Sequence, residues 1–145
     1  TTDDWNAPLR VDLAGAYECA QAAVPHMRRV GGGHIICFSD WTAASGRPRY
    51  KGYVPYYVAK RAVMGLTEAL ALELSADNIL VNAIAPGPII PPTELDSREV
   101  KEVERVTPLG RWGGAGAISE VVIGLLKTDF VTGETIRVDG GRHVR

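Results

Sequence analysis

The sequence predicts an α/β fold, namely half of a doubly wound domain with a parallel sheet. Segments with apolar residues at helical spacing alternate with short apolar runs that are typical of buried strands. The order is helix, strand, helix, strand, helices, strand, and such alternation favours right-handed crossovers between parallel strands. The long helices also carry more apolar surface than three strands can cover, which indicates one portion of a larger domain.

Two long helices are predicted. The first spans residues 3–29 and carries one apolar stripe, formed by Leu9, Leu13, Tyr17, Ala20, Val24 and Met27. The second spans residues 55–75 and begins at Pro55, because proline is favoured in a first turn. Glycines at 31–33 interrupt the chain after the first helix and predict a flexible link.

Three apolar runs predict strands that are buried in a parallel sheet: HIICF at 34–38, ILVNAIA at 79–85 and TIRV at 135–138. A charged helix follows the second run, with Asp96 as its N-cap, and an apolar helix covers residues 118–127.

Composition excludes several classes of function. Sixteen Lys and Arg face seventeen Asp and Glu without a basic block, so nucleic acid is not an expected partner. No apolar run is long enough to span a membrane, no secretory signal is visible, and the histidines lack metal-ligand spacing. Cys19 and Cys37 lie in apolar segments and are expected as buried thiols, which favours a reducing, cytoplasmic location.

Tyr56 and Lys60 stand four residues apart at the start of the second long helix, so their side chains share one face. A neighbouring ammonium and the positive helix N-terminus both favour the phenolate, so we expect the pKa of Tyr56 to be lowered. A phenol tuned in this way can transfer protons near neutral pH. Tyr57 and Arg61 repeat the spacing one residue later, and a plain surface pair is the alternative interpretation.

The runs PYYVAK…GLTEALALEL, ILVNAIAPGPI and VTGETIRVDGG resemble the short-chain dehydrogenase/reductase family, in the family's order and over nearly the whole chain. The resemblance implies a Rossmann-type sheet and an oxidoreductase that transfers hydride between NADPH and a small-molecule substrate. It implies catalytic roles for Tyr56 and Lys60 rather than for Tyr57 and Arg61.

The same resemblance implies that the cofactor is bound by Tyr56 and Lys60 and by the loop Pro86, Gly87, Pro88 and Ile89. Asp12 stands where the family usually has an asparagine that supports a proton relay. Asp12 is therefore a candidate catalytic residue, with a solvated helix acid as the alternative.

The N-terminal dinucleotide-binding half of the family, with its glycine-rich phosphate turn, has no counterpart in residues 1–145. These residues are expected to be the C-terminal portion of a single domain, either in a longer protein or in a truncated relative. Because the missing half contacts the adenosine end of the cofactor, NADP is inferred from the resemblance alone, and NAD stays an alternative.

Asp40 follows the first predicted strand, where most family members carry a serine that binds the substrate carbonyl. The runs FSDW, YVPYYVAK and APGPIIPP resemble the pteridine reductase branch, in which an aspartate takes that place. This implies a catalytic Asp40 and a pteridine-like substrate that is reduced at a C=N bond. Asp40 is otherwise a turn-capping acid, and Ser39 or Ser45 would replace the family serine.

Two other functions stay open at this point. One is a 3-oxoacyl-carrier-protein type of ketoreductase, and the other is an inactive structural or interaction module. The helices 3–29 and 55–75 resemble the family's main subunit contact, and their surplus apolar residues predict a homo-oligomer, either a dimer or a tetramer. On the second helix these surplus residues include Leu66, Leu70, Leu72 and Leu74.

Overall fold

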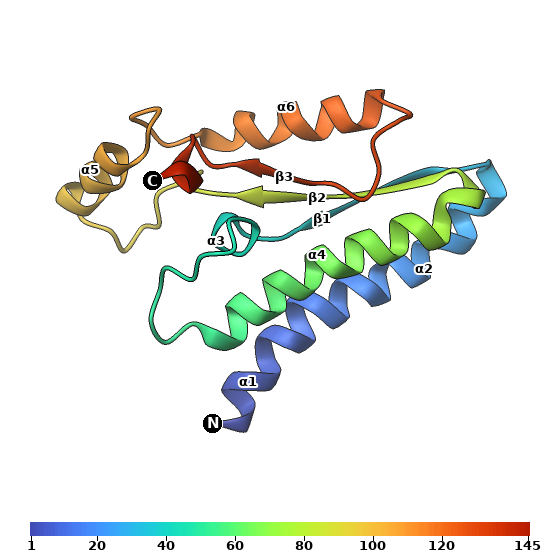
Figure 1. The fold of residues 1–145 in the computed structure, drawn as a ribbon, viewed down its shortest axis with the longest axis horizontal. Coiled ribbons are helices and arrows are strands. Elements are labelled where there is room, and N and C mark those ends of the chain that lie inside the picture. The colour runs from blue at the N-terminus through green and yellow to red at the C-terminus, as the bar shows by residue number, and fades with distance from the viewer.

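The structure is a computed structural model that describes residues 1–145 (Figure 1). It has an α/β fold, as the sequence predicts. Its elements in chain order are α1 (Thr2–Pro8), η1 (Leu9–Ala14), α2 (Gly15–Val30), β1 (Gly33–Phe38), α3 (Trp41–Ala44), α4 (Val54–Leu74), η2 (Ser75–Asp77), β2 (Ile79–Pro86), α5 (Ser97–Val106), α6 (Gly114–Lys127), β3 (Thr135–Val138) and η3 (Arg142–Val144).

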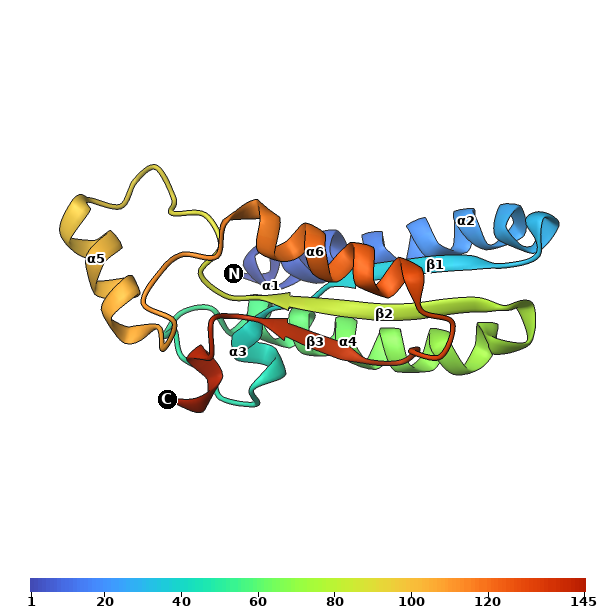
Figure 2. The same ribbon diagram turned by 90° about the horizontal axis from the view of Figure 1, so that it is seen from above.

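The three strands form a parallel sheet in the order β1-β2-β3. Gly33 pairs with Ile79 at the start of β1, and Ala83 pairs with Thr135 at the start of β3. Helices α2 and α4 lie along one face of the sheet and α6 along the other (Figures 1 and 2). The result is half of a doubly wound, three-layer arrangement.

The carboxyl ends of all three strands lie at one edge of the sheet, because the strands are parallel. β1 ends at Phe38, β2 at Pro86 and β3 at Val138. Three segments distant in sequence therefore emerge side by side, and α3 and η3 lie at this edge (Figure 1). Ligands of open α/β sheets bind at such an edge, so the functional site is sought there.

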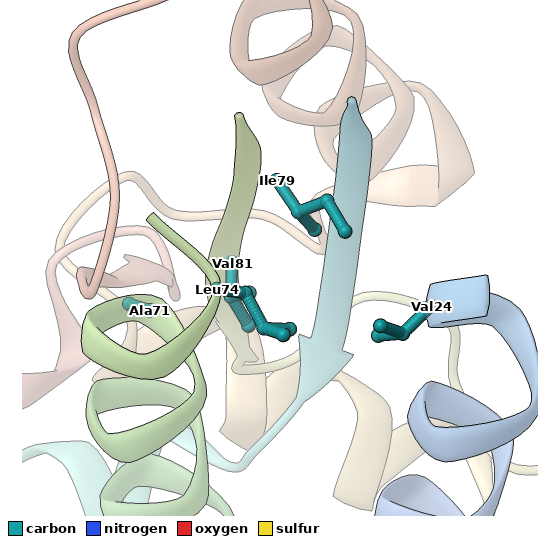
Figure 3. Packing of buried hydrophobic residues seen from close by; sticks show 5 residues of the cluster. All are labelled: Val24, Ala71, Leu74, Ile79 and Val81. Carbon is teal, nitrogen blue, oxygen red and sulfur yellow. The ribbon is translucent and has the colours of Figure 1, made fainter. Parts of the chain in front are cut away.

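The main hydrophobic cluster lies between the sheet and the two long helices. Val24 of α2 meets Ala71 and Leu74 of α4 over Ile79 and Val81 of β2 (Figure 3). Leu74 was expected on the surplus helix surface, and the structure instead buries it against β2.

Apolar surface is nevertheless left on α4, where Leu72 is 81% exposed. The assembly of subunits through these helices stays a prediction.

The first predicted helix is present but not uniform. Pro8 ends α1, and a π-helical segment follows it before α2 begins at Gly15. Proline lacks the N–H that would continue the ladder of α-helical hydrogen bonds, so a change of helix type after it has a physical cause. Single turns of π-helix are frequent at functional sites. Asp12 lies in this segment.

The glycines after α2 form a fixed turn rather than the flexible link that the sequence predicted. Gly31 has φ 87° and ends the helix in the left-handed conformation. A Cβ on Gly32 would lie 2.4 Å from the carbonyl oxygen of Asn78, so only glycine fits there. The turn thereby packs against the loop that leads into β2.

The cysteine prediction is half wrong. Cys37 is buried on β1, whereas Cys19 is exposed on α2, because it faces away from the core stripe.

No helix of the chain has the length and apolar character that a membrane crossing requires.

Packing around Val81 predicts a stability effect. Val81 is fully buried, so Val81→Ala in the full-length protein should lower the free energy of unfolding by about 1–3 kcal/mol, through lost burial and a residual cavity. Val30→Ala is the matched control, because Val30 is 82% exposed and its loss should change stability by less than about 0.5 kcal/mol. Denaturant unfolding measures both, and equal effects would contradict the described core.

Candidate active site

Tyr56 and Asp40 meet at the carboxyl edge of the sheet. Tyr56 lies in the first turn of α4, and its hydroxyl donates a hydrogen bond of 3.2 Å to Oδ2 of Asp40. Sixteen residues separate the two, and α3 with the following loop takes up this length and folds back. The separation therefore does not prevent the contact that the resemblance to the pteridine reductase branch implies.

Asp40 is at the same time the N-cap of α3. Its Oδ1 accepts hydrogen bonds from the backbone N–H and the hydroxyl of Thr42, while Oδ2 is left for Tyr56. The capping interpretation and the catalytic interpretation are thus compatible, because they use different oxygens. Each partner of the carboxyl group can donate a hydrogen bond to it.

Lys60 lies one turn after Tyr56 and is held on two sides. Its ammonium donates to the carbonyl oxygen of Phe38 at 3.1 Å and forms an ion pair of 3.0 Å with Asp12. The Lys60 side chain is 12% exposed and that of Asp12 is 24% exposed, so their ion pair is partly shielded from water. The ammonium lies 5.7 Å from the centre of the Tyr56 ring. Asp12, from the π-helical segment, therefore belongs to the same cluster.

The predicted direction of the Tyr56 pKa shift is wrong. Burial raises the pKa of Tyr56 above its ordinary value, and the charge of Asp40 and the hydrogen bond to it raise it further. The charge of Asp12 acts in the same direction. The expectation considered the helix N-terminus and the charge of Lys60, which the structure pairs with Asp12, but it did not consider burial or the charge of Asp40. The phenol is therefore protonated at neutral pH.

The second tyrosine–arginine pair has a structural role. The Arg61 guanidinium donates to the carbonyl oxygen of Ala43 and so fastens α4 to α3, and the hydroxyl of Tyr57 makes no hydrogen bond.

The two serines are also engaged elsewhere. Ser39 is buried and donates to the carbonyl oxygen of Lys60, and Ser45 donates to that of Thr42. Neither hydroxyl replaces the carboxylate beside Tyr56.

The loop after β2 presents backbone rather than side chains. A Cβ on Gly87 would lie 2.6 Å from Asp139, so only glycine at this position lets the loop come this close to the end of β3. The carbonyl oxygens of Pro88 and Ile89 accept hydrogen bonds from Gly113 and Gly114. The N–H of Ile89 donates to no group of the chain, which leaves it open to a ligand.

Beside Tyr56 is a cavity of about 170 Å³. Its lining is mostly aromatic and apolar: Thr42, Pro48, Arg49, Tyr50, Tyr53, Val54, Tyr56 and Tyr57. Nowhere do three or more His, Cys, Asp or Glu side chains gather as a metal site.

Sequence reasoning missed α3 and the role of Thr42. The order Asp-Trp-Thr is typical of a capped turn, because an Asp side chain often accepts from the N–H two residues later. This sequence pattern predicts the cap, but it does not show that Oδ2 of Asp40 remains available to Tyr56.

The sheet is parallel, has helices on both faces and carries a tyrosine, a lysine and a carboxylate at its carboxyl edge. These features define the site of a Rossmann-type oxidoreductase. Comparisons with known proteins agree with this class. The family described as enoyl-(acyl carrier protein) reductase matches residues 1–143. The chain belongs to the short-chain dehydrogenase/reductase family.

Individual relatives cover the chain almost completely. It is 36% identical over 144 residues to the 3-oxoacyl-(acyl-carrier-protein) reductase FabG of Thermotoga maritima, which covers 96% of this chain and 57% of that protein. An acetoin dehydrogenase from Enterobacter cloacae superposes with a TM-score of 0.85 at 35% identity, over 99% of this chain and 57% of the other.

A gluconate 5-dehydrogenase from Burkholderia cenocepacia, in complex with NADP and tartrate, gives a TM-score of 0.87 at 34% identity, over 100% of this chain and 58% of that one. The chain thus spans a little over half the length of these relatives.

The Asp40 contact predicts how Tyr56 titrates. Asp40→Asn removes the negative charge, so the pKa of Tyr56 in the full-length protein should move down toward its ordinary value. Alkaline titration followed by phenolate absorbance measures this, with Tyr56→Phe identifying the signal and Tyr57→Phe as the matched control. An unchanged late titration in Asp40→Asn would show that Asp40 does not hold the phenol proton.

Proposed function

We propose that the complete protein is an NADPH-dependent oxidoreductase that reduces a polar double bond, with Tyr56 as the proton donor. The observation that carries the proposal is the hydrogen bond from the Tyr56 hydroxyl to Asp40 at the carboxyl edge of the sheet. The protonated state of Tyr56, which burial and Asp40 favour, suits reduction, because reduction consumes one proton at the substrate.

The chain offers groups that fit the nicotinamide end of the cofactor. The open N–H of Ile89 suits a carboxamide oxygen, and Gly87 lets the backbone approach where a side chain would collide with Asp139. NADP is supported by the relative that is in complex with it. When bound, NADPH supplies the hydride. The phosphate end would be held by residues outside the chain described here.

Lys60 and Asp12 are proposed to supply protons to Tyr56. Their ion pair lies on the same face of α4 as the phenol, and the Lys60 ammonium is 5.7 Å from the ring centre. A proton lost from Tyr56 can be replaced through polar groups at this spacing, either directly or through one water. Asp12 orients the ammonium and balances its charge.

Asp40 supports a nitrogen-containing substrate. A ketone becomes an oxyanion as hydride arrives, and a site for it must supply donors. Asp40 has only acceptors when ionised, and its negative charge opposes an oxyanion. A C=N bond gains a proton at nitrogen instead, and a carboxylate beside Tyr56 can relay that proton or accept from neighbouring N–H groups. A pteridine-like ring has this chemistry.

A 3-oxoacyl-thioester ketoreductase is the second candidate. The relative from Thermotoga maritima is named a 3-oxoacyl-(acyl-carrier-protein) reductase, and the match to it covers 96% of this chain. In that case Tyr56 would be the main donor to the ketone oxygen, because Ser39 and Ser45 donate elsewhere.

The role of Tyr56 is tested by single hydroxyl removals in the full-length enzyme. Tyr56→Phe should lower kcat by at least about 10²-fold, because the proton donor is gone. Tyr57→Phe is the matched control and should change kcat by less than about threefold, since its hydroxyl has no partner in the site. Equal losses in steady-state NADPH oxidation would overturn the assignment.

Asp40→Ser tests the substrate class. The variant should lose at least about tenfold in kcat/KM on a dihydropteridine, and it should keep or gain activity on a simple ketone, to which serine can donate. Thr42→Val is a control for the cap alone, because it removes one hydroxyl partner of Asp40 but leaves the carboxylate. If Asp40→Ser leaves pteridine turnover intact, Asp40 acts only as the cap of α3.

A further inference from the structure

A second, larger cavity lies beside the cavity of Tyr56, and one residue in its lining is charged. It has a volume of about 490 Å³, within the range of small-molecule sites. Its walls are aromatic, aliphatic and proline side chains with one guanidinium: Trp41, Tyr50, Pro86, Gly87, Pro88, Ile89, Ile90, Pro92, Leu95, Val103, Trp112 and Arg142.

The cavity adjoins the reacting centre. Tyr50 lines both this cavity and that of Tyr56. Trp41 directly follows Asp40 in sequence, and the loop that begins at Pro86 forms another wall. A molecule in this cavity therefore lies within reach of the proposed proton donor and of the backbone that suits the nicotinamide.

Arg142 is the unusual member of the lining. Its guanidinium carbon lies 5.2 Å from the centre of the Trp41 ring, and none of its side-chain N–H groups donates to the chain. The guanidinium carbon of Arg49 lies over the same indole ring, 5.3 Å from its centre. Arg49 differs in that it also donates to the carbonyl oxygen of Arg145. Arg142 thus keeps a full set of donors without an acceptor.

Hydrogen bonds within the turn after β3 fix the position of Arg142. Asp139 is only 4% exposed, and its carboxylate accepts from the backbone N–H groups of Gly141 and His143. Gly141 has φ 81°, a conformation that glycine adopts without strain. This turn after β3 fixes the backbone on both sides of Arg142 and directs its side chain to Trp41.

Packing on Trp41 alone does not account for Arg142. One arginine already packs on the indole, and a second guanidinium near the same ring adds a like charge in a largely apolar site. A charge in such surroundings is stabilised when an opposite charge joins it. The planar guanidinium fork matches a carboxylate with two parallel hydrogen bonds.

We propose that Arg142 is a specificity-determining residue that binds a carboxylate group of the substrate. The preferred substrate is then a planar ring molecule with a reducible double bond at one end and a carboxylate at the other. The carboxylate rests on Arg142, the ring lies along Trp41 and Tyr50, and the reducible bond faces Tyr56. The inference rests on the proposed function for the location of the reacting end only.

Binding to the full-length enzyme with NADP present tests the inference without turnover. The probes are para-acetylbenzoate and para-acetylbenzamide, which share ring and ketone and differ in charge. Calorimetric titration of the wild type should give a Kd at least about tenfold lower for the benzoate. Arg142→Met should remove this preference, and Arg142→Lys should keep part of it, because charge remains while the fork is lost.

Arg49→Met is the matched control, because it removes the other guanidinium from Trp41 and should leave the preference in place. Thermal unfolding of each variant checks that the fold is kept. Equal affinities for the two probes in the wild type, no binding of the benzoate at millimolar concentration, or equal effects of Arg142→Met and Arg49→Met would each overturn the inference. Turnover is measured separately, with the Tyr56→Phe variant. If the wild type prefers the benzoate but Tyr56→Phe still reduces substrate at the wild-type rate, the proposed function is contradicted and the role of Arg142 is not.

Discussion

The hydrogen bond between the Tyr56 hydroxyl and the Asp40 carboxylate is the interaction on which the site depends. It joins the first turn of α4 to the segment that follows β1, and it adds to the rise that burial causes in the pKa of the phenol. A serine at the same place would offer a donor and no charge, so the two residues make different active sites from the same backbone. Burial and the carboxylate together raise the pKa of Tyr56, and they outweigh the positive field of the helix N-terminus.

The remaining site groups arrange themselves around that pair. Lys60 is paired with Asp12 and bound to the carbonyl oxygen of Phe38 at the end of β1, and its ammonium lies 5.7 Å from the centre of the Tyr56 ring. The π-helical segment after Pro8 brings Asp12 to the ion pair. The loop after β2 contributes the open N–H of Ile89 and part of the lining of the larger cavity, and the turn after β3 contributes Arg142 to the same lining. Each strand end thus supplies one part of the site, as parallel topology requires.

Local patterns in the sequence were enough for the fold and for the grouping of Tyr56 with Lys60. Apolar periodicity and the four-residue spacing each lie within one element, so both can be interpreted from the sequence without the tertiary structure. The direction of the Tyr56 pKa shift was not predictable, because it depends on a contact across sixteen residues and on burial. The burial of Leu74 and the exposure of Cys19 were misjudged for the same reason, since both depend on the side of the helix that meets the sheet.

The central claim is that a carboxylate beside the proton donor suits reduction at nitrogen better than reduction of a ketone. The most direct measurement offers the full-length enzyme, with limiting NADPH, a dihydropteridine and an acetoacetyl thioester at equal concentration, and quantifies both products. The account predicts that the reduced pteridine forms in excess. Predominant formation of the hydroxyacyl thioester would contradict it and would make the ketoreductase candidate the better description.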